Sequence, residues 1–172
     1  EICMQAVTPS GTAHYVNVFR PGKPMDETKD GQYSITLTIA PDHPKLAAFR
    51  KKVEEVATLK FGAKAKQMLE KGQLKNPIRD GNEKDDEHFQ GKVFITARSN
   101  DKPQVVDMDA EPVMDQDDFY SGCLARADVY IFAYEKPGNK GVSMILNSVQ
   151  KLGDGERLAG RRSAASAFAE ED

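Results

Sequence analysis

The sequence has no run of about 18 apolar residues, the length that a membrane-spanning helix needs, so we expect no membrane segment. It has only two cysteines, Cys3 and Cys123, and neither belongs to a CxxC pair. This argues against a disulfide scaffold and favours thiols in a reducing cytoplasm. The three histidines, His14, His43 and His88, are too scattered to predict a zinc site with those cysteines. We therefore expect no metal ion and no other cofactor.

Catalytic signatures are also missing, since the sequence contains no P-loop, no dinucleotide fingerprint and no GxSxG motif. Carboxylates are plentiful in residues 80–87 and 107–118, but Pro112 stands where a calcium-binding loop needs glycine. Two-metal phosphoryl transfer also needs carboxylates on rigid elements, and these segments are predicted loops. We expect a protein that is not an enzyme. A metal-dependent nuclease that uses Asp107 and Asp109 is the main alternative.

The chain has 172 residues, 39% apolar and 30% charged, which is typical of one globular domain with a real core. The net charge is only −3, but it is unevenly distributed. Residues 44–75 carry nine cations and three acids, and residues 76–122 carry five cations and twelve acids. We expect a folded domain over residues 1–160 and a flexible acidic tail over residues 161–172, which are too poor in apolar groups to fold alone.

The strongest structural signal lies in residues 119–151, which predict a β-hairpin. One alternating set predicts a core face: Ala125, Ala127, Val129, Ile131 and Ala133. The other set is predicted to point outward and mixes one arginine with three rings: Leu124, Arg126, Asp128, Tyr130, Phe132 and Tyr134. Rings two residues apart lie about 7 Å from each other along a strand. Residues 137–141 supply the glycines and asparagine of a hairpin turn.

The other predicted elements surround this hairpin. Residues 3–19 predict one or two strands whose core face is ambiguous, and residues 32–40 and 92–99 predict one strand each. A helix capped by Asp42 and a short helix closed by Gly72 form a helical insertion over about residues 43–72. Its lysines either attract a polyanion or keep a helix surface solvated. Residues 76–91 form a long polar loop of the kind that is usually functional or disordered.

These elements predict a mainly β fold, with five or six mostly antiparallel strands and no alternation of strands and helices. A five- to six-stranded antiparallel β-barrel with a helical insertion is the expected architecture, and the OB-fold is its best specific form.

Binding of a single-stranded nucleic acid requires cations for the phosphates and exposed rings on which bases stack. Two predicted strands offer this combination on their outward faces. The predicted nucleic-acid-binding residues are Lys92, Phe94, Arg98, Lys102, Arg126, Tyr130, Phe132, Tyr134 and Lys140. If the sheet were buried on both faces, the same rings would be core residues instead. Because a stacking platform accepts either sugar, an RNA-binding module stays an alternative.

Several segments, in this order along the chain, resemble a family of tailed-phage proteins long catalogued as a domain of unknown function, whose members look like single-stranded-DNA-binding proteins. The segments are HYVNVFRP at 14–21, GQYSITLTIAPD at 31–42, NPIRDG at 76–81, KPQVVD at 102–107, FYSGC at 119–123 and GVSMILNSVQ at 141–150. The signature residues Arg79, Tyr120 and Gly122 are expected to be structural: a turn arginine paired with acids, and a tyrosine and a glycine at a strand entry.

The resemblance implies an OB-fold factor that coats single-stranded DNA during phage replication or recombination, in the cytoplasm of the infected bacterial host. It also implies that the acidic tail shields the binding groove until DNA displaces it, and that the tail recruits partner proteins through Phe168, Glu170, Glu171 and Asp172. The commonest bacterial tails end on phenylalanine and this one does not, so docking into a host phenylalanine pocket is not implied. Dimerisation or cooperative assembly on DNA is left open.

Overall fold

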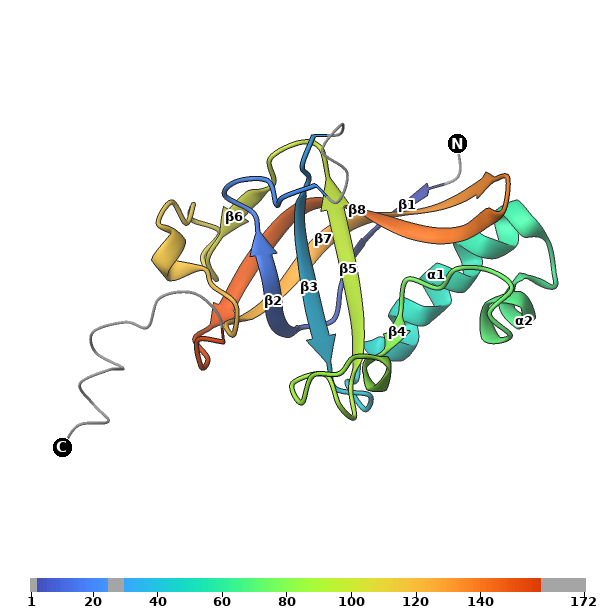
Figure 1. The fold of residues 1–172 in the computed structure, drawn as a ribbon, viewed down its shortest axis with the longest axis horizontal. Coiled ribbons are helices and arrows are strands. Elements are labelled where there is room, and N and C mark those ends of the chain that lie inside the picture. The colour runs from blue at the N-terminus through green and yellow to red at the C-terminus, as the bar shows by residue number, and fades with distance from the viewer. Residues whose placement is uncertain (1–2, 25–29, 159–172) are drawn as a thin grey trace.

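The computed structural model describes residues 3–24 and 30–158 (Figure 1). Within them the elements in chain order are β1 Cys3–Val7, β2 Gly11–Asn17, β3 Tyr33–Ile39, α1 Leu46–Phe61, α2 Ala65–Glu70, β4 Arg79–Asp80, β5 Val93–Ser99, β6 Gln104–Val106, β7 Leu124–Lys136 and β8 Asn139–Gly153. Neither α1 nor α2 is long and apolar enough to cross a membrane.

Five strands close a barrel. They follow the order β2–β3–β5–β8–β7, and β7 pairs back onto β2 through Gly11 and Ala125. The pairing of β5 with β8 is parallel and brings Arg98 opposite Ile145, and the short β6 also runs parallel to β8. All other pairings between named strands are antiparallel. A small closed barrel of five strands is the OB-fold architecture, which confirms the expected fold class.

The β7–β8 hairpin is longer than the barrel needs. Its strands have 13 and 15 residues, so the hairpin continues beyond the barrel toward the helical end of the molecule (Figure 1). Two strands share one edge of β7, because β2 pairs with its first residues and β1 pairs with residues 128–132. The predicted alternation is confirmed, since the inward set on β7 is buried throughout: Ala125, Ala127, Val129, Ile131 and Ala133.

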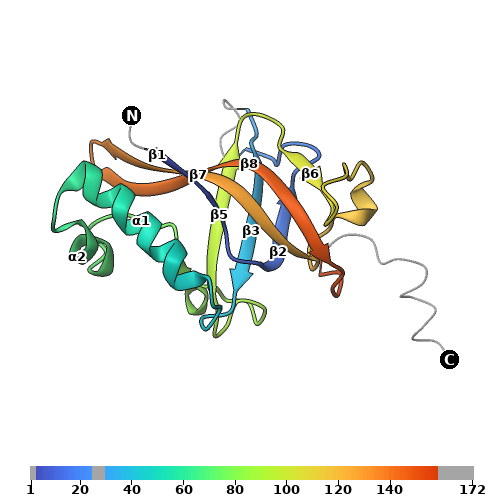
Figure 2. The ribbon, with the colours of Figure 1, turned by 180° about the vertical axis from the view of Figure 1, so that it is seen from behind.

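Helix α1 covers the inner face of the extended hairpin (Figure 2). Its buried side chains recur at helical spacing and belong to the same core cluster as Val129 and Ile131 of β7: Leu46, Phe49, Val53, Val56 and Ala57. The predicted cap at Asp42 is wrong, because α1 begins at Leu46 and its N-cap residue is Lys45, three residues after Asp42. There the His43 ring accepts a hydrogen bond from the Lys45 N–H at 3.0 Å. Gly72 has φ 75° after α2, the left-handed conformation that was predicted.

Replacement of Phe49 by alanine tests whether the helical insertion is part of the barrel core. Phe49 is almost fully buried, so we expect the variant to lose about 3–5 kcal/mol of unfolding free energy in urea denaturation. Leu59→Ala on the same helix is the control, because Leu59 is 63% exposed and should change stability by about 0.5 kcal/mol or less. A small loss for Phe49→Ala would mean that the insertion folds apart from the barrel.

Candidate nucleic-acid interface

The outward face of β7 carries a row of rings. Tyr130 is 37% exposed, and Phe132 and Tyr134 are half-buried, with their ring centroids 6.2 Å apart and the rings tilted at 49°. On the opposite face of the strand the side chains belong to the core. The structure therefore places the three predicted rings side by side on the outside of the hairpin, where each still has accessible surface.

The strand register extends this row across the barrel. Arg98 of β5 is opposite Ile145 of β8, and Ile145 is opposite Tyr130 of β7. Directly opposed residues of neighbouring strands point to the same face of a sheet, so a cation, an exposed aliphatic side chain and an exposed ring follow one another. Ile145 is 43% exposed, and Ser34 and Gln5 continue the row on β3 and β1. We call Arg98, Ile145, Tyr130, Phe132 and Tyr134 the hairpin platform.

Phe94 does not belong to this platform, which corrects the prediction that it is an exposed stacking ring. It lies outside the main core cluster, but it is only 2% exposed because Phe89 covers it. The two ring centroids lie 5.3 Å apart in an edge-to-face arrangement. The guanidinium of Arg79 and the ammonium of Lys84 lie over the Phe94 ring at 5.0 and 5.4 Å from its centroid. No base can stack on a ring that is covered in this way.

The loop that carries Phe89 lies at the lower end of β3 and β5 (Figure 1), and Phe89 packs there against Phe94 of β5. Beneath it His14 is buried, with its Nε2 atom 3.0 Å from the Thr38 hydroxyl and its ring centroid 4.7 Å from that of Phe89. Burial lowers the pKa of His14 to about 4, and the charge of Asp86 partly opposes this effect. The exterior around His14, Thr38 and Phe94 is therefore closed to a ligand.

One exposed tyrosine lies beside the sealed region. Tyr15 has φ 49°, where non-glycine residues are uncommon, and its ring is stacked on Phe89 with the centroids 6.2 Å apart. The bulge of β2 between His14 and Asn17 breaks the alternation that the sequence suggested for this strand. The neighbouring loop contributes the exposed acids Glu83, Asp85 and Glu87 together with Lys84, and Arg79 pairs with Glu83.

The remaining predicted cations lie apart from one another. Arg126 is half-buried at the barrel end of β7, where its Nε donates to Gln150 Oε1 at 2.8 Å. Lys92 precedes β5 beside the sealing loop, and Lys102 lies in the turn between β5 and β6. Lys140 is at the hairpin tip. The predicted tail residues lie outside the described part of the chain: Phe168, Glu170, Glu171 and Asp172.

The acidic loops are organised as backbone turns. The carboxylate of Asp107 accepts hydrogen bonds from the N–H groups of Asp109 and Glu111 at 2.9 and 3.0 Å. Asp80 accepts from the Asn82 N–H and Asp115 from the Asp117 N–H in the same way. Within residues 3–24 and 30–158, no group of three or more His, Cys, Asp or Glu side chains is arranged to hold a metal ion.

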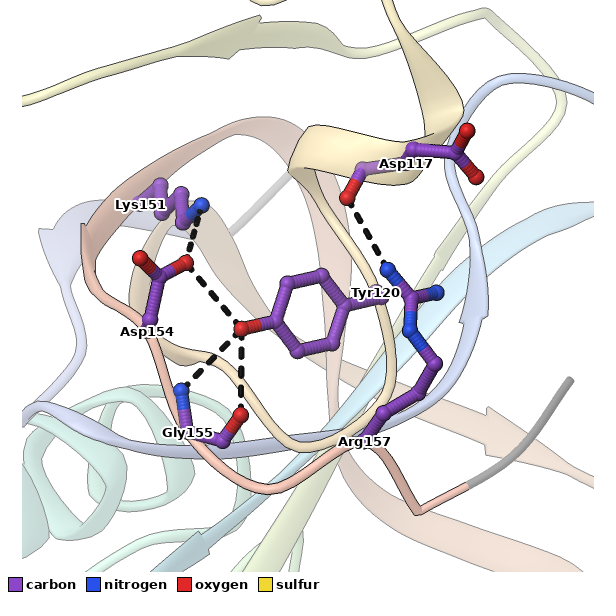
Figure 3. A network of polar contacts seen from close by, with 6 residues as sticks. All are labelled: Asp117, Tyr120, Lys151, Asp154, Gly155 and Arg157. Carbon is purple, nitrogen blue, oxygen red and sulfur yellow. Dashed lines mark hydrogen bonds and ion pairs between the residues drawn. The ribbon is translucent and has the colours of Figure 1, made fainter. Parts of the chain in front are cut away.

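Figure 3 shows what the FYSGC segment does. The Tyr120 hydroxyl lies 3.0 Å from Asp154 Oδ1 and accepts a hydrogen bond from the Gly155 N–H at 3.1 Å. The Arg157 guanidinium covers the Tyr120 ring at 4.3 Å, and Lys151 pairs with Asp154 at 2.7 Å. These contacts attach the residues after β8 to the barrel.

Two further signature residues are structural, as predicted. Gly122 has φ 115°, and a Cβ there would lie 1.7 Å from the Glu156 carbonyl oxygen, so only glycine fits. Arg79 pairs with Glu83 at 3.1 Å.

The closed barrel with rings and a cation on its exterior defines an OB-fold protein. Over residues 4–172 the sequence matches the family described as Enterobacter phage Enc34, ssDNA-binding protein, and the chain belongs to that family. This confirms the resemblance that the sequence segments indicated.

Individual relatives agree with this assignment. Protein p50 of Acyrthosiphon pisum secondary endosymbiont phage 1 is 32% identical over 113 residues, which cover 63% of this chain and 61% of p50. The single-stranded DNA-binding protein from bacteriophage Enc34, solved in complex with ssDNA, superimposes with a TM-score of 0.72 at 21% identity over 90% of this chain and 89% of that one. The gp2.5 protein of bacteriophage T7 superimposes with a TM-score of 0.64 at 15% identity over 99% and 95%. At these identities the two solved structures establish the fold.

The pKa of His14 predicts a specific pH dependence of stability. The folded protein binds a proton at His14 only near pH 4, whereas an unfolded histidine titrates near 6.5. As pH falls below 6.5 the unfolded chain is protonated first, so unfolding becomes easier until about pH 4, by up to about 3 kcal/mol.

Urea denaturation at pH 7, 5.5 and 4.5 measures this effect. His14→Gln should lose less unfolding free energy than the parent as the pH falls, because glutamine does not titrate. His88→Gln should lose as much as the parent, since the His88 side chain is 43% exposed. Equal losses in the parent and His14→Gln would show that His14 is not held neutral in the fold.

Proposed function

We propose that this protein binds single-stranded DNA without sequence preference and coats it during phage DNA replication or recombination, inside the infected bacterial cell. The observation that carries the proposal is the hairpin platform, which places Arg98, Ile145 and Tyr130 next to one another across three strands. The family assignment supports it, because the Enc34 protein is described as a single-stranded DNA-binding protein and was solved in complex with ssDNA.

The platform has the physical properties that such binding requires. Each base that stacks on an aromatic ring contributes roughly 1–3 kcal/mol, and a ring accepts any base because every base has a flat face. In a duplex the bases stack only on one another, so their faces do not reach Tyr130 or Phe132. The guanidinium of Arg98 attracts the phosphates of the same strand. Rings and cation together favour unpaired DNA over a duplex.

We infer the path of the DNA strand from the part of the barrel exterior that is closed. OB-folds commonly bind oligonucleotides on the face of their second and third strands, which are β3 and β5 here. Phe89 and its loop close the lower part of that face, where Phe94 is buried. The DNA therefore crosses β5 at the level of Arg98 and continues over β8 and β7.

We propose that the protein binds rather than cleaves DNA. Asp107 is occupied with backbone N–H groups, and its loop offers no metal cluster among the described residues. Incubation of a labelled single strand with magnesium or manganese tests the nuclease alternative. Cleavage that Asp107→Ala and Asp109→Ala abolish would overturn the binding function.

The acidic tail completes the proposal. We infer that residues 161–172 follow a folded domain of residues 1–160, compete with DNA for the cationic surface, and recruit replication or recombination proteins through Phe168 and the final acids. Support comes from their charge and from the attachment of the preceding residues. The last described residue, Leu158, donates its N–H to the Ser121 carbonyl at 2.9 Å.

Tyr130→Ala tests the platform in a fluorescence-anisotropy titration of labelled oligo(dT), with the corresponding duplex measured alongside. We expect the parent to prefer the single strand and the variant to bind it roughly 5- to 150-fold more weakly, the loss of about one stacked base. Tyr15→Ala is the matched control, because Tyr15 is also an exposed tyrosine but lies beside the acidic loop.

Little effect of Tyr15→Ala would support the hairpin platform. If Tyr15→Ala weakens binding and Tyr130→Ala does not, the DNA lies on the other side of the barrel. If the parent binds the single strand and the duplex equally, the proposed function is wrong.

Deletion of residues 163–172 tests the tail. We expect the truncated protein to bind oligo(dT) more tightly than the parent at low salt, because the three acids at the end of the chain no longer compete for the cations. At high salt the two proteins should bind equally, because salt screens this competition. A full-length variant with Glu170→Gln, Glu171→Gln and Asp172→Asn isolates the charge from the length of the tail. Unchanged or weaker binding after both changes would show that the tail does not compete.

A further inference from the structure

A cavity of about 650 Å³ lies between the turn that follows α2 and the tip of the β7–β8 hairpin. Figures 1 and 2 both show the hairpin tip at the helical end of the molecule. The cavity is lined by two segments that are far apart in the sequence: Gly72, Gln73 and Lys75 from the insertion, and the hairpin residues from Glu135 to Lys140. Three of the lining residues are lysines, and one is a glutamate.

The backbone at this cavity is held in place by paired hydrogen bonds. The Lys75 N–H donates to the Lys140 carbonyl, and the Val142 N–H donates to the Lys75 carbonyl, both at 3.0 Å. Lys75 thereby forms a parallel bridge with Gly141. A Cβ on Gly141 would lie 2.5 Å from Lys75 N and from Lys75 Cβ, so the close approach depends on glycine. The fold therefore fixes the main chains from which Lys75 and Lys140 project.

The lysines of this cavity outnumber its acids, and its one glutamate, Glu135, stands opposite Lys140 in the hairpin register. Among the residues that the structure describes, Lys75, Lys136 and Lys140 form no ion pair within 4.0 Å, and Glu135 is the only acid in the lining. Lys75 also belongs to the basic segment 44–75, which carries nine cations and three acids. With three lysines and one glutamate in its lining, the cavity has a net positive charge, which attracts an anion.

The cavity adjoins the ring row of the hairpin platform. Tyr134 is the last ring of the row and is paired in register with Gly141, the residue that contacts Lys75. Its hydroxyl donates to Asn139 Oδ1 at 3.1 Å, and Asn139 lines the cavity. A strand whose bases stack along Tyr130, Phe132 and Tyr134 thus reaches the edge of the cavity at Lys136, the next outward position of β7.

We propose that this cavity is a phosphate-binding site for the sugar–phosphate backbone of single-stranded DNA, formed by Lys75, Lys136 and Lys140. The inference rests on the proposed function and adds to it a role for the helical insertion, which supplies one wall of the interface through Lys75. The rings of the platform hold bases, and the cavity holds the phosphates of the nucleotides that follow. Single-stranded DNA has the required flexibility, since its backbone can turn at the end of the ring row.

The test is the salt dependence of oligo(dT) affinity in the full-length protein. Binding to phosphates releases counterions, so the logarithm of the affinity falls linearly with the logarithm of the salt concentration, by about 0.7 per contact with a single strand. The variant Lys75→Ala, Lys136→Ala, Lys140→Ala should show a slope that is smaller by about 2. The matched control is Lys51→Ala, Lys52→Ala, Lys66→Ala, which removes the same charge from exposed positions of α1 and α2 and should keep the parent slope.

The variant Lys75→Arg, Lys136→Arg, Lys140→Arg controls for a loss of structure. It keeps the three charges, so it should show the salt slope of the parent, and its melting temperature should equal that of the parent. If the cavity variant keeps the parent slope, or if the control variant loses as much, the cavity is not a phosphate site although the protein binds DNA. If the parent does not bind oligo(dT) at all, the proposed function fails, and the cavity assignment fails with it. Tyr130→Ala distinguishes the loss of base stacking from the loss of phosphate contacts, since it should weaken binding without changing the salt slope.

Discussion

The pairing of β7 with β8 is the interaction on which the rest of the structure depends. It runs from Leu124 opposite Gly153 to Lys136 opposite Asn139. One face of the ribbon forms the core with α1, and the other carries the rings. The edge of β7 that faces away from β8 pairs with β1 and β2, and the corresponding edge of β8 pairs with β5 and β6. A two-stranded hairpin is marginal alone, so this length is stable because strands cover both its edges and a helix covers its inner face.

The same ribbon explains why the proposed site lies where it does. A barrel of this kind has a large exterior, but most of its surface near β3 and β5 is unavailable because Phe89, Phe94 and His14 form a small second core there. The extended half of the hairpin has helix α1 on one side only, so its outer face remains open. The insertion that stabilises the hairpin also brings Lys75 to its tip. The packing of the insertion against the hairpin thus both completes the core and places Lys75 at the hairpin tip.

The success of sequence reasoning depended on how local each signal is. The alternation on β7 is a property of one strand, and the structure confirms each of its buried positions. The same reasoning correctly assigned Phe94 to the outward face of β5, but it could not know that Phe89, in a polar loop with only one other apolar residue, would fold back over that face. Lys75 and Ile145 were missed for a related reason, because nothing near either residue in the sequence reveals the partner on another strand. The predicted cap at Asp42 was wrong because three residues, 43–45, separate Asp42 from the first residue of α1.

By itself, the sequence determined the class of fold, the hairpin with its inward and outward faces, the uneven distribution of charge and the membership of a phage family. These follow from periodicity, turn residues and short motifs, which act over a few residues at a time. Only the tertiary structure decided which outward residues are accessible and which cations lie beside which rings. Closure of the barrel brings Arg98 next to Ile145. Packing of the insertion on the hairpin brings Lys75 next to Gly141, and the loop that carries Phe89 buries Phe94. Such contacts join residues that are distant in the chain, and their geometry is set by the register of whole strands.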